Sequence, residues 1–594
     1  MRKKNPNQPN PRNAQDSLHD AMDFDPRDPM AGLSVADLCG ATLSRRTTLR
    51  LMAAAGTLTM AHLLPGTGNM LREAQAASGG TLTCGWSGVG EIRTLDPAQI
   101  NQVLQFQVAS NVLSGLTHID ASLVARGDLA ESWEVSADGK EYTFQLRQGV
   151  TFHNGDAFDA DDVLYTFNRS RDPEKSIHGG AIKNVMEVIK VDSHTVKFVL
   201  AAPQASFLVK SLERSSGRAM TIVSRGAIDK LGLPQYGLTP VGTGPFKVVS
   251  HTLGQGVVLE KFTNYYDPDR PKLDKVVIKP IIDAEPLAAA LEAGDIQLIG
   301  GNPVPGELVD RFTSNPDLIV NEIPGPGFQC VWMNPWRDPF KVADFNKPVS
   351  ELMQESGFKV RLAIAKALDR DRYIKQAQFG RGTPAYGSIN PAMGFYFDPD
   401  LEASSAQKYD LEAARKLLAD AGYPGGEGMR KLELLATPSA RREATVVADI
   451  LKKNLGIRVE LVTKDFPVLI DDFDTMNWDL VRLGSGGDFD PDDGLVDWLT
   501  TSSKFNGRNR DKSKFAFGYF SDSEMDRLTD AQSATADINK RKEMVQQANK
   551  ITSDKVATAF LFHPADVQVR SKRVNFPAES RIPGLVDLDR VTLS

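Results

Sequence analysis

Residues 129–167 read LAESWEVSADGKEYTFQLRQGVTFHNGDAFDADDVLYTF. The Asp138-Gly139 pair is typical of a turn between two antiparallel strands, because both residues tolerate the backbone conformation that such a turn requires. After this turn, Tyr142 and Phe144 alternate with polar residues, which places them on one face of a strand. The stretch therefore predicts a β-hairpin with one buried face.

An amphipathic helix is expected directly after this hairpin. Asp159 can cap the helix, since its carboxylate can accept a hydrogen bond from a backbone N–H of the first turn. Val163 and Phe167 lie one turn apart and provide an apolar stripe. Strands and helices are thus mixed in this part of the chain.

The second half of the chain has the pattern of a parallel α/β unit. Residues 432–435 indicate a strand, residues 442–455 have helical periodicity and stop at Gly456, and residues 457–461 alternate like a second strand. A strand, a helix and a strand in this order require a right-handed crossover between parallel strands. The predicted fold class is α/β.

Loop chemistry marks two places where the chain is expected to cross between lobes. The first crossing is expected at residues 324–327, which read PGPG, and the second near residues 559–564. Two α/β lobes joined by two strands are the economical architecture. We assign residues 77–326 to lobe I, residues 327–559 to lobe II and residues 560–594 to a return to lobe I.

The first 76 residues are predicted to export the rest of the chain. Residues 1–43 lack any helical or strand period and are expected to be a disordered extension. Residues 44–76 contain Arg45-Arg46, an apolar run too short to span a bilayer, and a small-residue cleavage motif that ends at Ala76. This pattern is typical of a twin-arginine signal peptide, with ordinary secretion and a buried core helix as alternatives.

Composition excludes several classes of protein. The length of 594 residues excludes a small module, and a net charge of −7 without a basic stripe argues against a nucleic-acid partner. Three cysteines are too few for a disulfide scaffold and lack zinc-binding spacing. Cys84 and Cys330 could pair in an oxidising compartment, but two buried thiols are the favoured interpretation.

Motifs of enzymes and metal sites are incomplete, so we predict no catalytic residues, no cofactor and no metal. Residues 85–89 fail the nucleophile-elbow pattern of hydrolases at their last position. Residues 488–494 begin like a calcium loop, but Asp493 and Leu499 occupy the positions that need glycine and glutamate. An exported hydrolase is therefore the weaker alternative to a binding protein.

At family level, the opening stretch at residues 129–167 closely resembles the central signature of extracellular solute-binding proteins of the peptide/nickel class, family 5. Further landmarks of that family follow in the right order: Gly242–Phe246, Asn264–Tyr266, Val360–Arg370, Tyr409-Asp410 and Ala421–Pro424. The resemblance covers nearly all of the chain after the signal peptide.

This resemblance implies both a fold and a function. The implied fold is the two-lobed periplasmic binding protein fold of class II type, with a ligand cleft between the lobes and a two-strand hinge. The implied function is a periplasmic, monomeric receptor that closes on a short peptide or peptide-like solute and delivers it to an inner-membrane ABC permease complex. Receptors for a nickel or haem chelate, an opine or an oligosaccharide are alternatives within the same family.

The resemblance also implies ligand-binding residues after a strand of lobe II. In the family, this segment carries an aspartate that pairs with the α-amino group of a peptide. Asp488 is the best match, and Ser485, Gly486 and Gly487 precede it. The alternative is that the acidic cluster only caps a helix that starts after Pro491.

Four further residues are candidates for the cleft. Arg441 lies near the place where some dipeptide receptors hold the ligand carboxylate with a guanidinium fork, or it is a solvated helix residue. Trp332 and Trp336 follow the first crossing, and Trp86 follows the first strand, so their rings could wall the cleft. Core packing is the alternative for each tryptophan.

Overall fold

The computed structural model describes residues 80–87, 91–100, 102–121, 123–214, 220–301, 304, 306–486, 490–502, 520–535, 537–577 and 586–594. The predicted extension, Arg45, Arg46 and the cleavage site after Ala76 lie outside the described residues. In the part of the chain that the structure describes, no helix is both long enough and apolar enough to cross a membrane.

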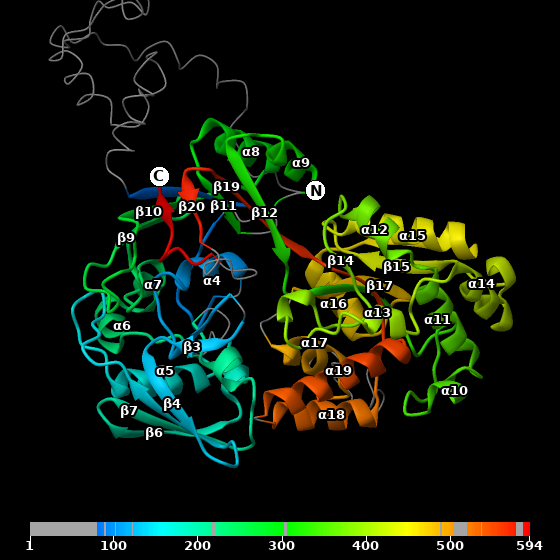
Figure 1. The fold of residues 1–594 in the computed structure, drawn as a ribbon, viewed down its shortest axis with the longest axis horizontal. Coiled ribbons are helices and arrows are strands. Elements are labelled where there is room, and N and C mark those ends of the chain that lie inside the picture. The colour runs from blue at the N-terminus through cyan, green and yellow to red at the C-terminus, as the bar shows by residue number, and fades with distance from the viewer. Residues whose placement is uncertain are drawn as a thin grey trace, which may run out of the picture. The chain divides into compact units, whose positions relative to one another are not determined.

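The first large sheet has the strand order β12-β19-β11-β1-β10-β9-β8. Its strands are β1 (Thr81–Ser87), β8 (Phe246–Thr252), β9 (Gly256–Lys261), β10 (Lys275–Pro280), β11 (Leu298–Gly301), β12 (Leu318–Pro324) and β19 (Ala565–Ser571). Side chains of α4 (Val103–Ala109) pack with β1 and β10 in one core, whereas α8 (Ala284–Ala293) and α9 (Gly306–Thr313) pack with β11 and β19 in another. Figure 1 shows α8 and α9 next to β12.

A smaller sheet with the order β4-β5-β7-β6 belongs to the same half of the chain. It contains β4 (Ala130–Val135), β5 (Glu141–Leu146), β6 (Val185–Asp192) and β7 (Thr195–Leu200). The predicted hairpin is confirmed, because β4 pairs antiparallel with β5, and Tyr142 and Phe144 are buried. The predicted helix is also confirmed: α5 (Ala160–Arg171) starts with a capping box of Asp159 and Asp162.

The second large sheet has the order β14-β18-β13-β17-β15-β16. Its strands are β13 (Phe328–Met333), β14 (Thr383–Pro384), β15 (Leu432–Ala436), β16 (Val459–Thr463), β17 (Leu480–Ser485) and β18 (Ala559–His563). The expected parallel unit is present, since β15 and β16 are parallel and α15 (Arg441–Leu455) connects them.

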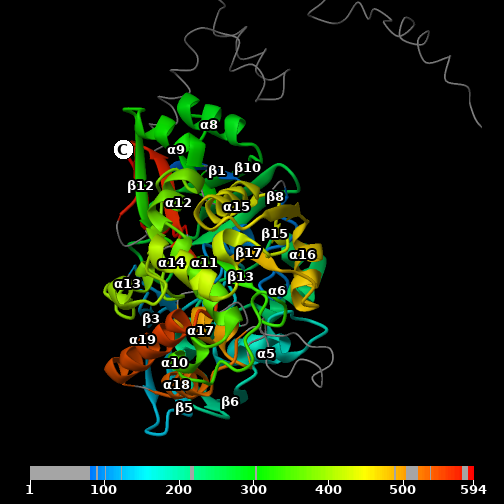
Figure 2. The same ribbon diagram turned by 90° about the vertical axis from the view of Figure 1, so that its right-hand side faces the viewer.

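One hydrophobic core joins this sheet to the helices around it. These helices are α11 (Ser356–Ala367), α12 (Arg370–Ala377), α14 (Leu411–Asp420), α15, α16 (Phe466–Asp474), α17 (Pro491–Leu499), α18 (Ser523–Ser533) and α19 (Ile538–Asp554). Figure 2 looks onto α11, α12, α14 and α15, which cover one side of the sheet.

The remaining described helices and strands are shorter. The α-helices are α6 (Arg225–Leu231), α7 (Leu233–Leu238), α10 (Val349–Leu352) and α13 (Leu401–Ser404), and the other short helices are η1 (Gly179–Ile182), η2 (Phe207–Ser211), η4 (Pro391–Met393) and η5 (Pro424–Gly426). The strands are β2 (Thr117–Ile119), β3 (Ala125–Gly127), β20 (Val574–Asn575) and β21 (Thr592–Leu593).

The chain passes between the two large sheets at residues 325–327 and at Pro564. The first passage leads from β12 to β13, and the second leads from β18 back to β19. The two passages touch, because the backbone N–H of Gly325 donates to the carbonyl oxygen of Pro564 at 2.8 Å. The sequence analysis assigned residues from 560 onward to the return to lobe I. In the structure, β18 still pairs with strands of the second sheet, so the return begins after β18.

The two cysteines that the structure describes are free and buried. Cys84 lies in β1 of the first sheet and Cys330 in β13 of the second, so the prediction of two buried thiols is confirmed. Burial raises the pKa of both thiols, that of Cys330 to about 12. Both side chains therefore remain protonated and unreactive near neutral pH.

Candidate functional site

The predicted ligand segment emerges beside the first passage between the sheets. β17 ends at Ser485, which pairs with Phe328 at the start of β13. A Cβ atom on Gly327 would overlap the carbonyl oxygen of Ser485, so the close approach of the two segments requires glycine. Gly486 follows Ser485, and α17 begins after Asp490.

Two of the predicted ligand residues, Gly487 and Asp488, lie outside the described residues. Their role in binding an amine stays a prediction. Gly486 is exposed, and no other residue lies close to its Cβ direction. Ser485 is buried, and its hydroxyl donates to the carboxylate of Asp493 at 2.7 Å, which ties the end of β17 to α17.

The acidic cluster after this segment caps a helix, as the alternative interpretation expected. The carboxylate of Asp490 accepts a hydrogen bond from the backbone N–H of Asp492 at 3.0 Å and starts α17. Arg541 on α19 donates to both oxygens of Asp490, at 2.9 and 2.6 Å. Burial and the neighbouring Asp492 raise the pKa of Asp490, while Arg541 opposes them. This buried ion pair fixes α17 against α19.

Asp492 forms a contact that the sequence analysis missed. On its own lobe, it accepts hydrogen bonds from Gln532 at 2.5 Å and from Ser533 at 3.1 Å. Its second oxygen accepts from the hydroxyl of Ser206, which follows β7 of the four-stranded sheet, at 2.7 Å. No local pattern could have indicated this pair, because 286 residues separate the two side chains.

Arg441 and its neighbour Arg442 occupy the start of α15. Arg441 is the first residue of the helix and is exposed, so its carboxylate-binding role stays a prediction. The guanidinium of Arg442 lies 3.8 Å from the ring centroid of Phe379 and donates to the carbonyl oxygen of Gln376. The guanidinium of Arg442 therefore binds groups of lobe II.

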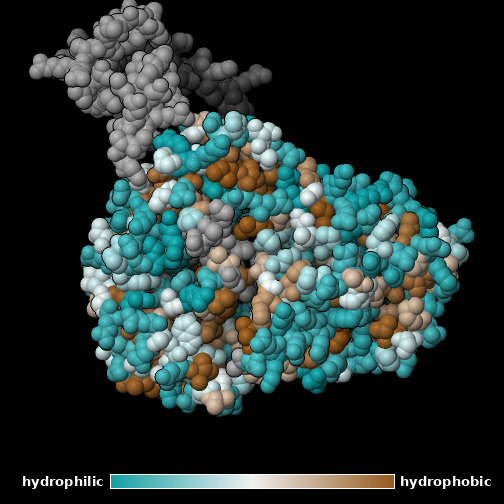
Figure 3. Space-filling model, in the orientation of Figure 1, coloured by the Kyte–Doolittle hydropathy of each residue, from teal (hydrophilic) through white to brown (hydrophobic). Residues whose placement is uncertain are grey.

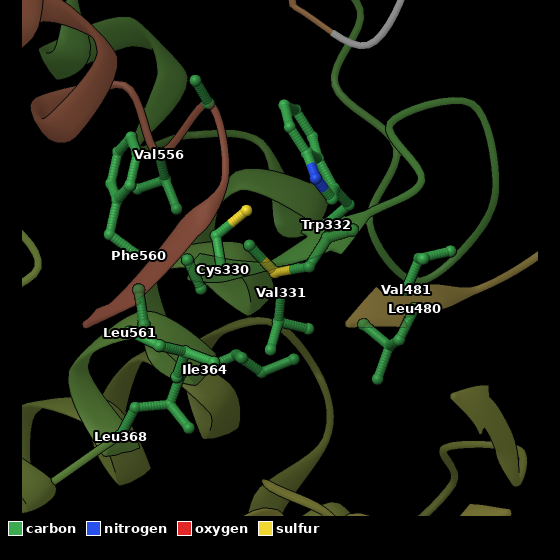
Figure 4. Close-up of a cluster of buried hydrophobic side chains, with 14 of the residues drawn as sticks. Cys330, Val331, Trp332, Ile364, Leu368, Leu480, Val481, Val556, Phe560 and Leu561 are labelled. Atoms are coloured by element: carbon green, nitrogen blue, oxygen red, sulfur yellow. The ribbon is translucent and has the colours of Figure 1, made fainter. Parts of the chain in front are cut away.

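The three candidate tryptophans do not come together. Trp86 lies within β1 and not after the first strand as predicted; it is buried in the core of the first sheet and donates its indole N–H to Gln107 at 2.7 Å. Trp332 is buried in the core of the second sheet and stacks on Trp498, with 6.1 Å between ring centroids; Figure 4 shows it beside Cys330. Trp336 is 39% exposed. Trp86 and Trp332 are therefore core residues, as the alternative interpretation expected.

Two buried polar residues hold the passage itself and were also missed. Asn390 donates to the carbonyl oxygen of Pro326 at 2.6 Å. His563 places Nδ1 3.1 Å from the carbonyl oxygen of Gly327, and burial lowers its pKa to about 4, so it is neutral at pH 7. Both act on backbone groups, which leave no signature in the sequence.

The described residues contain no group of three or more His, Cys, Asp or Glu side chains arranged to hold a metal ion.

Two α/β lobes joined by paired passages define the two-lobed fold of periplasmic binding proteins. The solved structure of DppA from Helicobacter pylori in complex with the peptide STSA has this fold, with a TM-score of 0.67 and 22% identity over 88% of this chain and 99% of that chain. AgaA of A. tumefaciens R10 in complex with agropinic acid matches with a TM-score of 0.66 and 25% identity over 87% of this chain and 99% of that chain.

Residues 125–507 match the family model described as bacterial extracellular solute-binding proteins, family 5 Middle. The chain therefore belongs to family 5 of the bacterial extracellular solute-binding proteins, as the sequence motifs predicted. It is 31% identical over 334 residues to the glutathione-binding protein GsiB of Escherichia coli (strain K12). That similarity covers 56% of this chain and 60% of the length of GsiB.

Proposed function

We propose that this protein is the solute receptor of an ABC importer, which captures its ligand between two lobes and delivers it to a membrane permease. The observation that carries the proposal is the pair of touching passages at Gly325 and Pro564, directly beside the predicted ligand segment at Ser485 and Gly486. Two adjacent connections of this kind suit hinge closure. Closure then requires the ligand to bind the closed form better than the open form.

A short peptide or peptide-like amine is the proposed ligand. GsiB is named for binding glutathione and DppA was solved with a peptide, which supports this class of solute. Asp488 supplies a carboxylate for the ammonium group of such a ligand. The structure of AgaA with agropinic acid supports an opine-type solute as the alternative. A nickel or haem chelate and an oligosaccharide are further alternatives within the family.

Asp488→Asn is expected to weaken the binding of an aminated ligand by roughly thirtyfold or more, because losing one partner of a desolvated charge pair costs about 2 to 5 kcal/mol. Native mass spectrometry identifies the solute that co-purifies, and titration calorimetry measures its affinity. Asp420→Asn, at an exposed position of α14, is the control and should leave the affinity unchanged. A neutral co-purifying ligand, or equal affinities of Asp488→Asn and Asp420→Asn for the ligand, would exclude an aminated ligand.

A receptor of this kind is proposed to have no catalytic activity and to act as a monomer. Incubation of the purified protein with its peptide ligand should therefore return the peptide intact. Peptide hydrolysis that one Ser or Asp substitution abolishes would establish the hydrolase alternative, and metal analysis of the native protein would reveal a chelate receptor.

Export to the periplasm through the twin-arginine route, with cleavage after Ala76, is proposed from the sequence of residues 44–76. Replacing both Arg45 and Arg46 with lysine is expected to leave uncleaved precursor in the cytoplasm. Cell fractionation and immunoblotting measure this, and the double variant Arg12→Lys/Arg27→Lys in the extension is the matched control. Undiminished mature protein in the periplasm of the Arg45/Arg46 variant would contradict the twin-arginine route.

A further inference from the structure

The loop after β7, residues 201–214, contains the short helix η2 (Phe207–Ser211) and reaches from lobe I to helices of lobe II. The backbone N–H of Ala205 donates to the carbonyl oxygen of Ser533 at 2.6 Å. The Ser206 hydroxyl donates to Asp492, and the ammonium of Lys210 lies 3.3 Å from the carboxylate of Asp497. One short loop thus makes three polar contacts with α17 and α18.

The acceptor for Ser206 is held in place by its own lobe. Gln532 and Ser533 bind the other oxygen of Asp492, and the guanidinium of Arg541 lies 3.7 Å away. Asp492 is 7% exposed and Ser206 1% exposed, so the hydrogen bond between them is shielded from water. A buried carboxylate that is already oriented accepts a hydrogen bond at little further cost in entropy.

An apolar contact lies beside these polar ones. Ile119 and Leu123 of lobe I form a small buried cluster, against which both Val209 of lobe I and Ala392 of lobe II pack; Ala392 belongs to the short helix η4 (Pro391–Met393) before α13. This small cluster adds buried apolar surface to the same junction between lobes.

We propose that residues 201–214 form a closure latch, in which Ser206 and Lys210 bind Asp492 and Asp497 and stabilise the closed arrangement of the lobes without any ligand. Both partners in every contact are residues of this chain, so the latch forms without the solute. This inference rests on the proposed function only in assuming that the lobes open and close.

The latch would set how tightly the receptor binds its solute. When the binding-competent arrangement is only partly populated, the apparent dissociation constant rises in inverse proportion to that population. A latch that favours closure therefore increases the apparent affinity, and residues that never touch the ligand tune it.

Single-molecule energy transfer on the ligand-free protein tests the latch. Met186 on β6 and Ile538 on α19 are 63% and 52% exposed and lie in different lobes, so cysteines introduced there accept a donor and an acceptor dye. Cys39 is replaced by serine, and the other two native cysteines, Cys84 and Cys330, are buried and do not compete for the labels. The ratio of high-efficiency to low-efficiency molecules reports the ratio of closed to open protein.

Ser206→Ala is expected to lower the closed-to-open ratio about tenfold, since it removes a hydrogen bond to a buried charged acceptor. Ser211→Ala is the matched control, because the Ser211 hydroxyl lies in the same loop but donates to Ala181 within lobe I. That control should keep the wild-type ratio.

A charge swap provides a rescue. Lys210→Glu should lower the ratio about threefold, and the double variant Lys210→Glu/Asp497→Lys should restore it. A wild-type protein that is entirely open without ligand, or equal ratios in wild type and Ser206→Ala, would overturn the latch. Neither outcome bears on whether the protein binds a solute, which the calorimetry of Asp488→Asn tests separately.

Discussion

Replacing Arg541 with methionine is expected to lower the free energy of unfolding by about 3 to 5 kcal/mol at pH 7, because it leaves a buried carboxylate without its cation. Arg541 donates to both oxygens of Asp490 and lies close to Asp492, and all three side chains are buried. Without the guanidinium, two neighbouring carboxylates remain in a medium that disfavours their charge.

The loss should be smaller at pH 5 than at pH 7. Burial and the neighbouring Asp492 already raise the pKa of Asp490 in the folded state, and in the variant Arg541 no longer opposes them. The folded state therefore gains a proton first as the pH falls, and this protonation relieves part of the penalty. Urea denaturation followed by tryptophan fluorescence measures the free energy at both pH values.

Two further variants define the origin of this effect. Arg527→Met removes an arginine on α18 that pairs with Glu524 at 2.7 Å but is 62% exposed, and it should change the free energy of unfolding by less than about 0.5 kcal/mol. Asp490→Leu/Arg541→Met removes both charges and should recover much of the loss. A loss in Arg541→Met that is independent of pH would contradict the buried-charge explanation.

Arg361→Lys is expected to cost about 3 kcal/mol of folding stability, since lysine cannot reproduce several charge-assisted hydrogen bonds at once. The buried guanidinium of Arg361 donates to the carbonyl oxygens of Met333 at 2.6 Å, Val556 at 2.7 Å and Ala557 at 2.9 Å. Burial lowers its pKa to about 9, so the group is charged at pH 7 and joins α11 to both β13 and the turn before β18.

Arg415→Lys is the matched control for this prediction. Arg415 on α14 also donates to a backbone carbonyl oxygen, that of Asn454 at 2.9 Å, but its side chain is at the surface. Water can replace this bond, so the substitution should change stability by less than about 0.5 kcal/mol. Chemical denaturation measures the free energy of unfolding of the two variants. Equal losses would show that the buried hydrogen bonds of the Arg361 guanidinium contribute little to stability.

Arg361 also explains a motif that identified the family. It lies in the landmark Val360–Arg370, and Arg370 at the other end donates to the carbonyl oxygens of Ala385 and Gln407. Both arginines bind backbone groups inside lobe II, so this landmark is a packing element that holds the helices on the second sheet. The face in Figure 3 is largely hydrophilic, with apolar residues in separate groups.

Local patterns in the sequence predicted several elements of the fold. The Asp138-Gly139 turn, the cap at Asp159 and the crossover between β15 and β16 depend on residues a few positions apart, and the structure has all three. Turn geometry, capping and periodicity are properties of the local backbone, so one sequence reveals them. The ordered family motifs added the two-lobed architecture.

Tertiary structure alone decided which polar groups meet. Ser206 and Asp492, and likewise Asp490 and Arg541, are brought together by segments whose separation along the chain carries no periodic signal. The burial of Trp86 and Trp332 was equally open in the sequence, because an aromatic ring suits a cleft wall as well as a core. Long-range pairing and burial depend on how whole sheets and helices pack, and local patterns carry no information about that packing.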